Sequence, residues 1–347
     1  MMRAVVWRHG ELLVNADVRE PIPAVGQVLI EVLASGICGS DVHFTRHARD
    51  IVALSATVRG LKRVPPPSVD LNRDVFMGHE FSGRVLEVGP DTTAPPPGTV
   101  VTALPALISR SGIADLAYSN DWPCGYSERM VVSAPLMIPV PAHLDPKYAA
   151  MTEPVAVAIH AVNRSAIDVS DTAIVLGCGP VGLCIIAALR RRGVDFVVAS
   201  DLTGSRRDLA RAMGAALVVD PNGESVYKAA RTARKTVVIF EAIGVPGIID
   251  GIWREAPARS RVVVVGVCTQ RDAITPYYAI TKELDVRFSL AYDQLEFRNS
   301  LEALADGTID VAPLITGQIR LDEVPAMFGQ LAQTPEHGKV IVIPGSS

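Results

Sequence analysis

Hydrophobic residues follow two different patterns along this 347-residue chain. Up to about residue 150, short β-branched runs are interrupted by glycine and proline, as at 28–32, 81–88 and 98–101. Short strands bounded by turns predict a β-rich, barrel-like domain. From about residue 171, continuous apolar runs such as the four valines at 262–265 alternate with helical patterns. Strands that are apolar on both faces and separated by helices predict a doubly wound parallel α/β sheet.

The second pattern predicts a sheet of six strands. We expect them at 172–176, 195–201, 216–219, 237–241, 261–267 and 284–290, with helices at 181–192 and 205–213 among the connections. After residue 291, a helix at 297–305 and a last strand at 340–343 are expected to return to the first domain. The predicted division is therefore 1–152, 153–290 and 291–347.

The net charge indicates which partners are not expected, and the cysteine content indicates the cellular compartment. A net charge of −4 gives no electrostatic footprint for nucleic acid or an anionic membrane, so neither is expected as a partner. The N-terminus enters a strand-like run without a signal-peptide pattern. Five scattered cysteines do not form the framework of a disulfide-rich secreted protein. We therefore expect a cytoplasmic protein.

A glycine-rich loop joins the first strand and first helix of the predicted sheet. It contains Gly177, Gly179, Pro180, Val181 and Gly182. In this context Gly177 permits the tight turn, Gly179 lets the backbone approach a pyrophosphate, and Gly182 lets helix and strand pack. The helix N-terminus then offers unpaired N–H groups to the phosphates. The loop predicts dinucleotide binding.

Acidic and basic residues after the next strand bear on which dinucleotide binds. Asp201 stands where a carboxylate would bind the adenosine ribose hydroxyls and repel a 2′-phosphate, which favours NAD over NADP. Arg206 and Arg207 follow closely, and either could meet a phosphate or could be a solvated residue of the helix. NAD is the predicted cofactor.

Potential metal ligands are concentrated in the first region. Cys38 lies in the segment 36–43, His79 and Glu80 follow Gly78, and Glu153 precedes a proline. Thiolate, imidazole and carboxylate are ligands that Zn²⁺ accepts when one position must stay open for substrate. Glu80 could instead bond to backbone, and Glu153 could cap a helix. A metal that polarises an alcohol and a nucleotide that accepts hydride together indicate a dehydrogenase.

These motifs occur in the order found in a known family. The segments 36–43, 78–80, 125–128 and 152–154, with the loop at 177–182, resemble the zinc-dependent alcohol dehydrogenases of the medium-chain dehydrogenase/reductase superfamily. The resemblance covers nearly the whole chain. It implies a GroES-like catalytic domain around a Rossmann domain, a small hydroxyl substrate, and a homodimer or homotetramer. The sheet edge near 284–290 is the candidate contact between subunits.

The resemblance also implies a role for each motif residue. Cys38 and His79 match the first two zinc ligands. Glu153 stands where simple alcohol dehydrogenases have a cysteine, and Glu80 matches a carboxylate that binds or approaches zinc in the polyol and threonine dehydrogenase branch. The third ligand therefore stays open between Glu80 and Glu153. Asp41 resembles the acceptor that orients His79, and the resemblance further assigns Ser40 and His43 to a proton relay.

Two departures from the family pattern are expected to matter. Between Pro95 and Met130 the chain has one cysteine, Cys124, so we expect one catalytic zinc and no structural zinc. The interval from Cys38 to His79 is long, which implies an insertion around 44–74 near the substrate. Its run 51–58 could be helical. Its basic residues, Arg46 and Arg49 among them, either favour an anionic substrate or form a solvated face.

Two alternatives to a zinc-dependent dehydrogenase remain at this point. The first is a zinc-free NADPH quinone or enoyl reductase of the same superfamily, a branch that lacks the metal-ligand set. The second is a non-catalytic nucleotide-binding sensor or structural protein that reuses the fold. A complete ligand set and relay favour the dehydrogenase, acting on a secondary alcohol or polyol.

Overall fold

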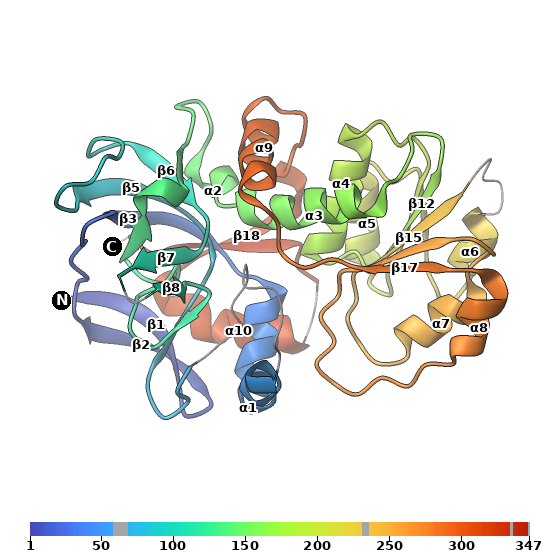
Figure 1. Cartoon of the computed structure of the whole chain (residues 1–347), viewed down its shortest axis with the longest axis horizontal. Helices are drawn as coiled ribbons and strands as arrows, with labels where there is room; N and C mark the ends of the chain where they lie inside the picture. Colours follow the sequence, from blue (N-terminus) through green and yellow to red (C-terminus); the bar gives the residue numbers. More distant parts are fainter. Residues whose placement is uncertain (58–68, 111, 231–235, 334–335, 346–347) are drawn as a thin grey trace. The chain divides into compact units, whose positions relative to one another are not determined.

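The computed structural model describes residues 1–57, 69–110, 112–230, 236–333 and 336–345. The chain divides into two compact units, each considered by itself (Figure 1). Unit 1 comprises Met1–Glu153, Ile315–Pro335 and Lys339–Ser347, and unit 2 comprises Pro154–Leu314 and Glu336–Gly338. The basic residues Arg59, Lys62 and Arg63 of the expected insertion lie outside the described residues.

Unit 1 is built mainly from antiparallel strands, as its short strands predict, although β18 and β19 pair in parallel. One sheet has the order β2-β1-β4-β9, a second has the order β11-β6-β5-β3-β19-β18 with β10 also paired to β3, and β7 and β8 form a hairpin. The strands are β1 Met2–Arg8, β2 Glu11–Val18, β3 Gln27–Gly36, β4 Val75–Met77, β5 Glu80–Val88, β6 Val100–Ala103, β7 Ala106–Ser109, β8 Gly112–Asp115, β9 Tyr118–Ser119, β10 Arg129–Ser133, β11 Met137–Pro139, β18 Ile315–Arg320 and β19 Lys339–Ile343.

Of the helices that the structure describes in unit 1, the first and the last pack on one of its two apolar cores, and the short second one lies against β3 and β5. These helices are α1 Gly39–Thr57, α2 Pro146–Ala149 and α10 Val324–Gln333. Phe44 of α1 is fully buried and packs with Trp7, Tyr126 and Phe328 in one core cluster, and the second cluster lies among the strands. A segment that starts at Gly39 is therefore anchored in the core by the residues that follow its polar motif.

Unit 2 contains the predicted six-stranded parallel sheet, in the order β14-β13-β12-β15-β16-β17 (Figure 1). Its strands are β12 Thr172–Leu176, β13 Val197–Ser200, β14 Leu217–Val219, β15 Val237–Glu241, β16 Arg261–Val264 and β17 Asp285–Phe288. Its helices are α3 Thr152–Ser165, which begins at the end of unit 1, α4 Pro180–Arg191, α5 Gly204–Ala212, α6 Val226–Ala229, α7 Ile248–Glu255, α8 Pro276–Lys282 and α9 Gln294–Ala305. The central strands are buried along their length, which confirms the doubly wound architecture.

Residues 291–314 lie in unit 2, whereas the expected return to the first domain began at 291. The physical reason is a polar anchor on α9. Glu296 accepts a hydrogen bond from Asn163 Nδ2 at 2.9 Å and contacts His160 Nδ1 at 2.8 Å, and both partners are on α3. The chain returns to unit 1 with β18, at Ile315.

Helix α1 is longer than the run 51–58 that the sequence suggested. It begins at Gly39 and includes Ser40, Asp41 and His43, so the polar motif is helical. The backbone departs from helical geometry at His47, with φ −129° and ψ 23°, and the helix continues beyond this kink. None of the helices in the described segments is long and apolar enough to span a membrane.

Candidate functional site

Cys38 is positioned by the end of one strand and the start of a helix. It lies between β3 and α1, where its carbonyl oxygen accepts the first N–H groups of the helix, from Asp41 at 3.1 Å and Val42 at 3.4 Å. Its side chain is half-buried. The thiol therefore stands on a rigid junction rather than on a free loop.

His79 and Glu80 enter the same region from the turn between β4 and β5. The pairing of β3 with β5 sets Glu80 directly opposite Gly36. A side chain on Gly36 could not be accommodated, because its Cβ would lie 2.0 Å from Glu80 Oε2. The glycine thus leaves room for the Glu80 carboxylate beside Cys38.

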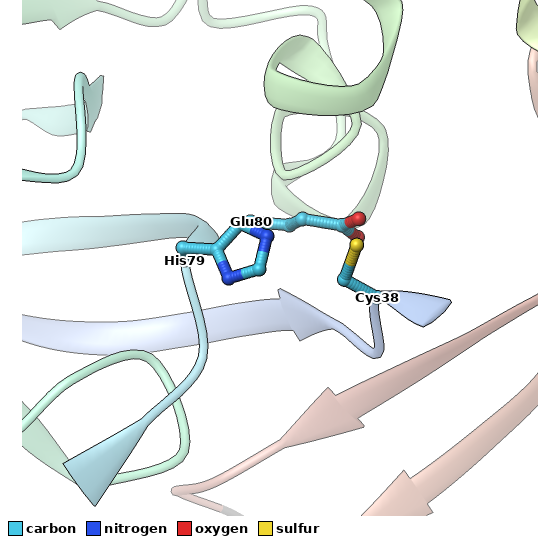
Figure 2. A group of neighbouring side chains, drawn as sticks. All are labelled: Cys38, His79 and Glu80. Carbon is cyan, nitrogen blue, oxygen red and sulfur yellow. The ribbon is translucent and has the colours of Figure 1, made fainter. Parts of the chain in front are cut away.

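The three side chains converge. One ligand atom from each of Cys38, His79 and Glu80 lies within 4.8 Å of the others, and Figure 2 shows the imidazole, the thiol and the carboxylate gathered at one place. His79 and Glu80 are buried. In the parts of the chain that the structure describes, this is the one group of three or more such side chains with that geometry. Glu153, at the first turn of α3, is half-buried and does not belong to it.

Asp41 backs the imidazole of His79. Asp41 Oδ1 lies 3.5 Å from His79 Nδ1, and Asp41 Oδ2 accepts a hydrogen bond from Tyr126 Oη at 2.5 Å. Both atoms of the Asp41–His79 contact are buried and lack a hydrogen-bond partner. Burial lowers the pKa of His79, but the nearby Asp41 and Cys38 outweigh it and raise the pKa well above its usual value. An electropositive centre at Nε2 would hold the proton on Nδ1, facing Asp41.

The donor set fits a zinc ion. A thiol, an imidazole and a carboxylate converge at one point, and the imidazole is already directed by a second carboxylate. Asp41 Oδ1 and His79 Nδ1 are buried without a hydrogen-bond partner. A cation bound at Nε2 of His79 would keep the proton on Nδ1, where it can be donated to Asp41. The chemistry of these residues therefore fits a zinc ion with an open position for substrate.

Lys339 is a member of the site that the sequence did not reveal. Its ammonium group donates to both oxygens of Glu80, at 2.7 and 2.6 Å, and to the carbonyl oxygen of Ile37 at 3.0 Å. Lys339 and Glu80 each expose 1% of their side chains. A lysine directly before the apolar run 340–343 was the available signal, because a charged residue at the start of a core strand needs a partner.

The two residues expected to form a proton relay, Ser40 and His43, lie in the first turns of α1. Ser40 Oγ donates to Cys38 Sγ at 3.1 Å, and the hydroxyl of Tyr118 is hydrogen-bonded to Ser40. Tyr118 itself stacks on Phe44, with ring centroids 4.3 Å apart. Burial lowers the pKa of His43, and the neighbouring His47 and Arg46 lower it further. The lowered pKa favours the neutral form of His43, which is the form that can accept a proton.

The lobe after β6 is held by ordinary packing. Leu107 and Leu116 are fully buried, and Cys124 lies in the same apolar cluster, where burial raises the pKa of its thiol well above the usual value. Asp115, at the end of β8, accepts a hydrogen bond from the Ala117 N–H at 2.7 Å. Burial raises the pKa of Asp115 from 3.8 to about 6, although the Ala117 N–H and His79 oppose the shift.

Asp115 should make stability depend on pH. Between about pH 4 and pH 6 the unfolded chain loses the Asp115 proton while the folded chain keeps it, so stability should fall as pH rises through this window. Asp115→Asn still accepts from Ala117 but cannot ionise. The thermal midpoint of the metal-free variant, relative to the wild type, should therefore be several degrees higher at about pH 7 than at about pH 4. Thermal unfolding at both pH values tests this, and an equal difference at the two would contradict it.

The glycine loop of unit 2 has the geometry expected of a dinucleotide loop. Gly177 has φ +90°, and a Cβ on Gly182 would lie 1.9 Å from the Gly177 carbonyl oxygen. Pro180 and Val181 open α4, whose first turn directs its N–H groups toward the loop. A further carboxylate was missed: buried Glu241, at the end of β15, accepts from the N–H groups of Ile243 and Gly244 at 2.7 Å.

Asp201 follows β13, as expected, and is engaged with the backbone. Its two oxygens accept the N–H groups of Cys178 and Thr203, each at 2.8 Å. Arg207 binds the Asp201 and Leu202 carbonyls and pairs with Asp220 at 2.9 Å. Arg206 points its guanidinium toward Gly179, and its buried Nε has no hydrogen-bond partner. Of the two arginines, Arg206 is the one available to a ligand.

Known proteins resemble this chain over most of its length. Residues 24–142 match the alcohol dehydrogenase GroES-like domain, and residues 180–306 match the zinc-binding dehydrogenase domain. The chain is 30% identical to (R,R)-butanediol dehydrogenase of Bacillus subtilis, over 99% of this chain and 100% of that protein. It is 26% identical to sorbitol dehydrogenase of Bos taurus, over 93% and 91% of the two chains.

The fold of the chain is also similar to that of a solved structure. A zinc-binding dehydrogenase of Sinorhizobium meliloti 1021, bound to NADP, superposes with a TM-score of 0.82 at 28% identity and 99% coverage of both chains. The chain belongs to the zinc-dependent alcohol dehydrogenase family of the medium-chain dehydrogenase/reductase superfamily. It is therefore an oxidoreductase with a GroES-like and a Rossmann domain.

Proposed function

We propose that the protein is a zinc- and NAD-dependent dehydrogenase that oxidises a secondary alcohol or polyol-type hydroxyl. The observation that carries the proposal is the convergence of Cys38, His79 and Glu80 within 4.8 Å. Membership of the family and the similarity to butanediol and sorbitol dehydrogenases support an alcohol substrate. The zinc-free reductase branch lacks such a ligand set, and a non-catalytic protein would not need the relay of Ser40 and His43.

The residues divide the work as follows. Cys38, His79 and one carboxylate would hold the zinc, which lowers the pKa of a bound water from about 15.7 to roughly 7 and would act in the same direction on a bound alcohol. Asp41 keeps His79 in the correct tautomer. Ser40, beside Cys38, takes the hydroxyl proton, and neutral His43 accepts it. The glycine loop and the N-terminus of α4 bind the dinucleotide that takes the hydride.

The carboxylate ligand is one of two residues. Glu80 is close to Cys38 and His79, but both of its oxygens accept from Lys339, so a metal must compete with an ammonium group for it. Glu153 is half-buried in the first turn of α3 and stands at the position where the resemblance places the third ligand. The zinc content of Glu80→Gln and Glu153→Gln, each measured on purified protein, would identify the ligand.

The test of the function is a substrate panel with metal analysis. Secondary alcohols, vicinal diols and polyols are offered with NAD and, in parallel, with NADP, and nicotinamide reduction is followed by absorbance. We expect oxidation of at least one class with NAD and one zinc per chain. Two zinc ions per chain would refute the single-site proposal. A preference for NADP would overturn the role given to Asp201, whose oxygens already accept two backbone N–H groups, and would give that role to Arg206.

We also propose a cytoplasmic homodimer or homotetramer. All five cysteines lack disulfide bonds in the described structure, which agrees with a reducing compartment. Strand β17 is at an edge of the six-stranded sheet, and Phe288 at its end and Leu290 beyond it are 66% and 61% exposed. Pairing of this edge with a second copy would cover them. Light scattering should give the mass of two or four chains, and a monomer would refute the assembly.

A further inference from the structure

Three polar side chains follow one face of helix α1. Ser40, His43 and His47 are spaced three and four residues apart, and this spacing brings side chains onto the same side of a helix. The first of them reaches Cys38, with Ser40 Oγ 3.1 Å from the sulfur. The face therefore leads from Cys38 along the helix. The expected relay ends at His43, and His47 is the next polar side chain on the same face.

The two imidazoles are in contact. The ring centroids of His43 and His47 are 4.7 Å apart, with an angle of 41° between the ring planes. Both side chains are half-buried. The backbone of His47 leaves helical geometry at this residue, with φ −129° and ψ 23°, so the second ring is held where the helix bends.

Within the described residues, the charged groups near the ring pair can be named element by element. Arg46, an exposed neighbour on α1, acts on His43 together with His47, and Arg49 and Asp50 are exposed on the same helix. Helix α10, which packs against α1, has no ionisable side chain among its residues 324–333. From β9, Tyr118 bonds Ser40 and stacks on Phe44. A proton that reaches His43 thus finds His47 as an adjacent base.

We propose that His47 is the second imidazole of the proton relay and passes the substrate proton to solvent. The step balances without any further reagent. Ser40 gives its hydroxyl proton to one nitrogen of His43 as it takes the substrate proton. His43 releases the proton of its other nitrogen to His47, and the His47 imidazolium discharges to water or buffer. This inference rests on the proposed dehydrogenase function and adds a residue to it.

The test compares His47→Gln with two reference variants. Arg46→Gln removes a charge that also acts on His43 but cannot carry a proton, and His43→Gln removes the first imidazole. Proton release is followed with a pH indicator and nicotinamide reduction by absorbance, at low buffer and with added imidazole. For His47→Gln we expect kcat at low buffer to fall at least about threefold, short of the ~10²–10⁴-fold of a group acting on substrate directly. Imidazole should restore it.

The outcomes separate the inference from the function on which it rests. Added imidazole should not raise the kcat of Arg46→Gln relative to the wild type, because the guanidinium carries no proton in the relay. If His43→Gln is impaired while His47→Gln behaves as the wild type at low buffer, the relay ends at His43 and the inference is wrong. If His43→Gln is itself unimpaired, the relay of the proposed function fails, and His47 has no role in it.

A second readout requires neither metal nor substrate. Proton NMR titration of the histidine rings in the metal-free protein gives the pKa of His43 directly. Because His47 and Arg46 both lower this pKa, it should rise in His47→Gln and in Arg46→Gln alike. A shift with Arg46→Gln but none with His47→Gln would show that the two rings are not coupled and would overturn the proposal.

Discussion

The Cys38→Ser variant is expected to purify without zinc and without dehydrogenase activity. Cys38 provides the thiol of the converging group, and a serine hydroxyl is not an anion at neutral pH. Even residues that merely orient a ligand change metal affinity by ~10–100-fold when mutated. Loss of a ligand should therefore lower zinc affinity and kcat/KM by more than about 100-fold. Metal analysis and initial rates on the same preparation measure both.

A matched control separates loss of the metal from loss of the fold. Cys124 is buried in the core of the same unit and is not part of the converging group, so Cys124→Ser should keep its zinc. The half-buried Cys38 can accept a side chain of similar shape, and circular dichroism of Cys38→Ser should match the wild type. A Cys38→Ser protein that loses zinc yet keeps its activity would refute the metal-dependent mechanism.

Among the single substitutions considered for this protein, removal of the Lys339 ammonium group is expected to lower the free energy of unfolding the most. Lys339→Met leaves the fully buried Glu80 carboxylate without its partner, and such a change typically costs about 3–5 kcal/mol. It also removes the hydrogen bond to Ile37, which precedes Cys38. Denaturant unfolding of the metal-free protein measures the free energy of unfolding without a contribution from bound zinc.

The double variant Glu80→Met/Lys339→Met distinguishes a stranded charge from a packing defect. Replacement of both partners by apolar side chains of similar length leaves no buried charge unpaired and is often neutral. Most of the stability lost in Lys339→Met should therefore return in the double variant. If the double variant is as unstable as the single one, the loss comes from packing around residue 339 and not from the Glu80 charge.

The architecture followed from the sequence because its signals are local. Four successive valines at 262–265 predict a strand that is buried on both faces, and β16 is such a strand. The predicted strand ran on to residue 267, but the N–H groups of Val265 and Gly266 both turn to the Glu241 carbonyl and end it at Val264. A strand end of this kind depends on a neighbour that local patterns do not reveal.

The site was predictable where its residues form motifs, and not where partners are distant. Cys38, His79 and Glu80 were found from short segments, and the structure brings them together. Lys339 was missed because it is 259 positions from Glu80, and only the pairing of β19 with β3 brings it there. Likewise, no pattern indicates that both oxygens of Asp201 are bonded to backbone.

The discontinuous composition of unit 1 has a consequence for the order of synthesis. Glu80 leaves the ribosome early, whereas Lys339 is in the last strand and emerges after the whole of unit 2. Unit 2 is continuous over Pro154–Leu314 and can fold during translation, as domains generally do. Until β19 has been synthesised, unit 1 lacks Lys339, the residue that pairs with the Glu80 carboxylate in its core. The surroundings of Glu80 are thus completed only after unit 2 has been synthesised.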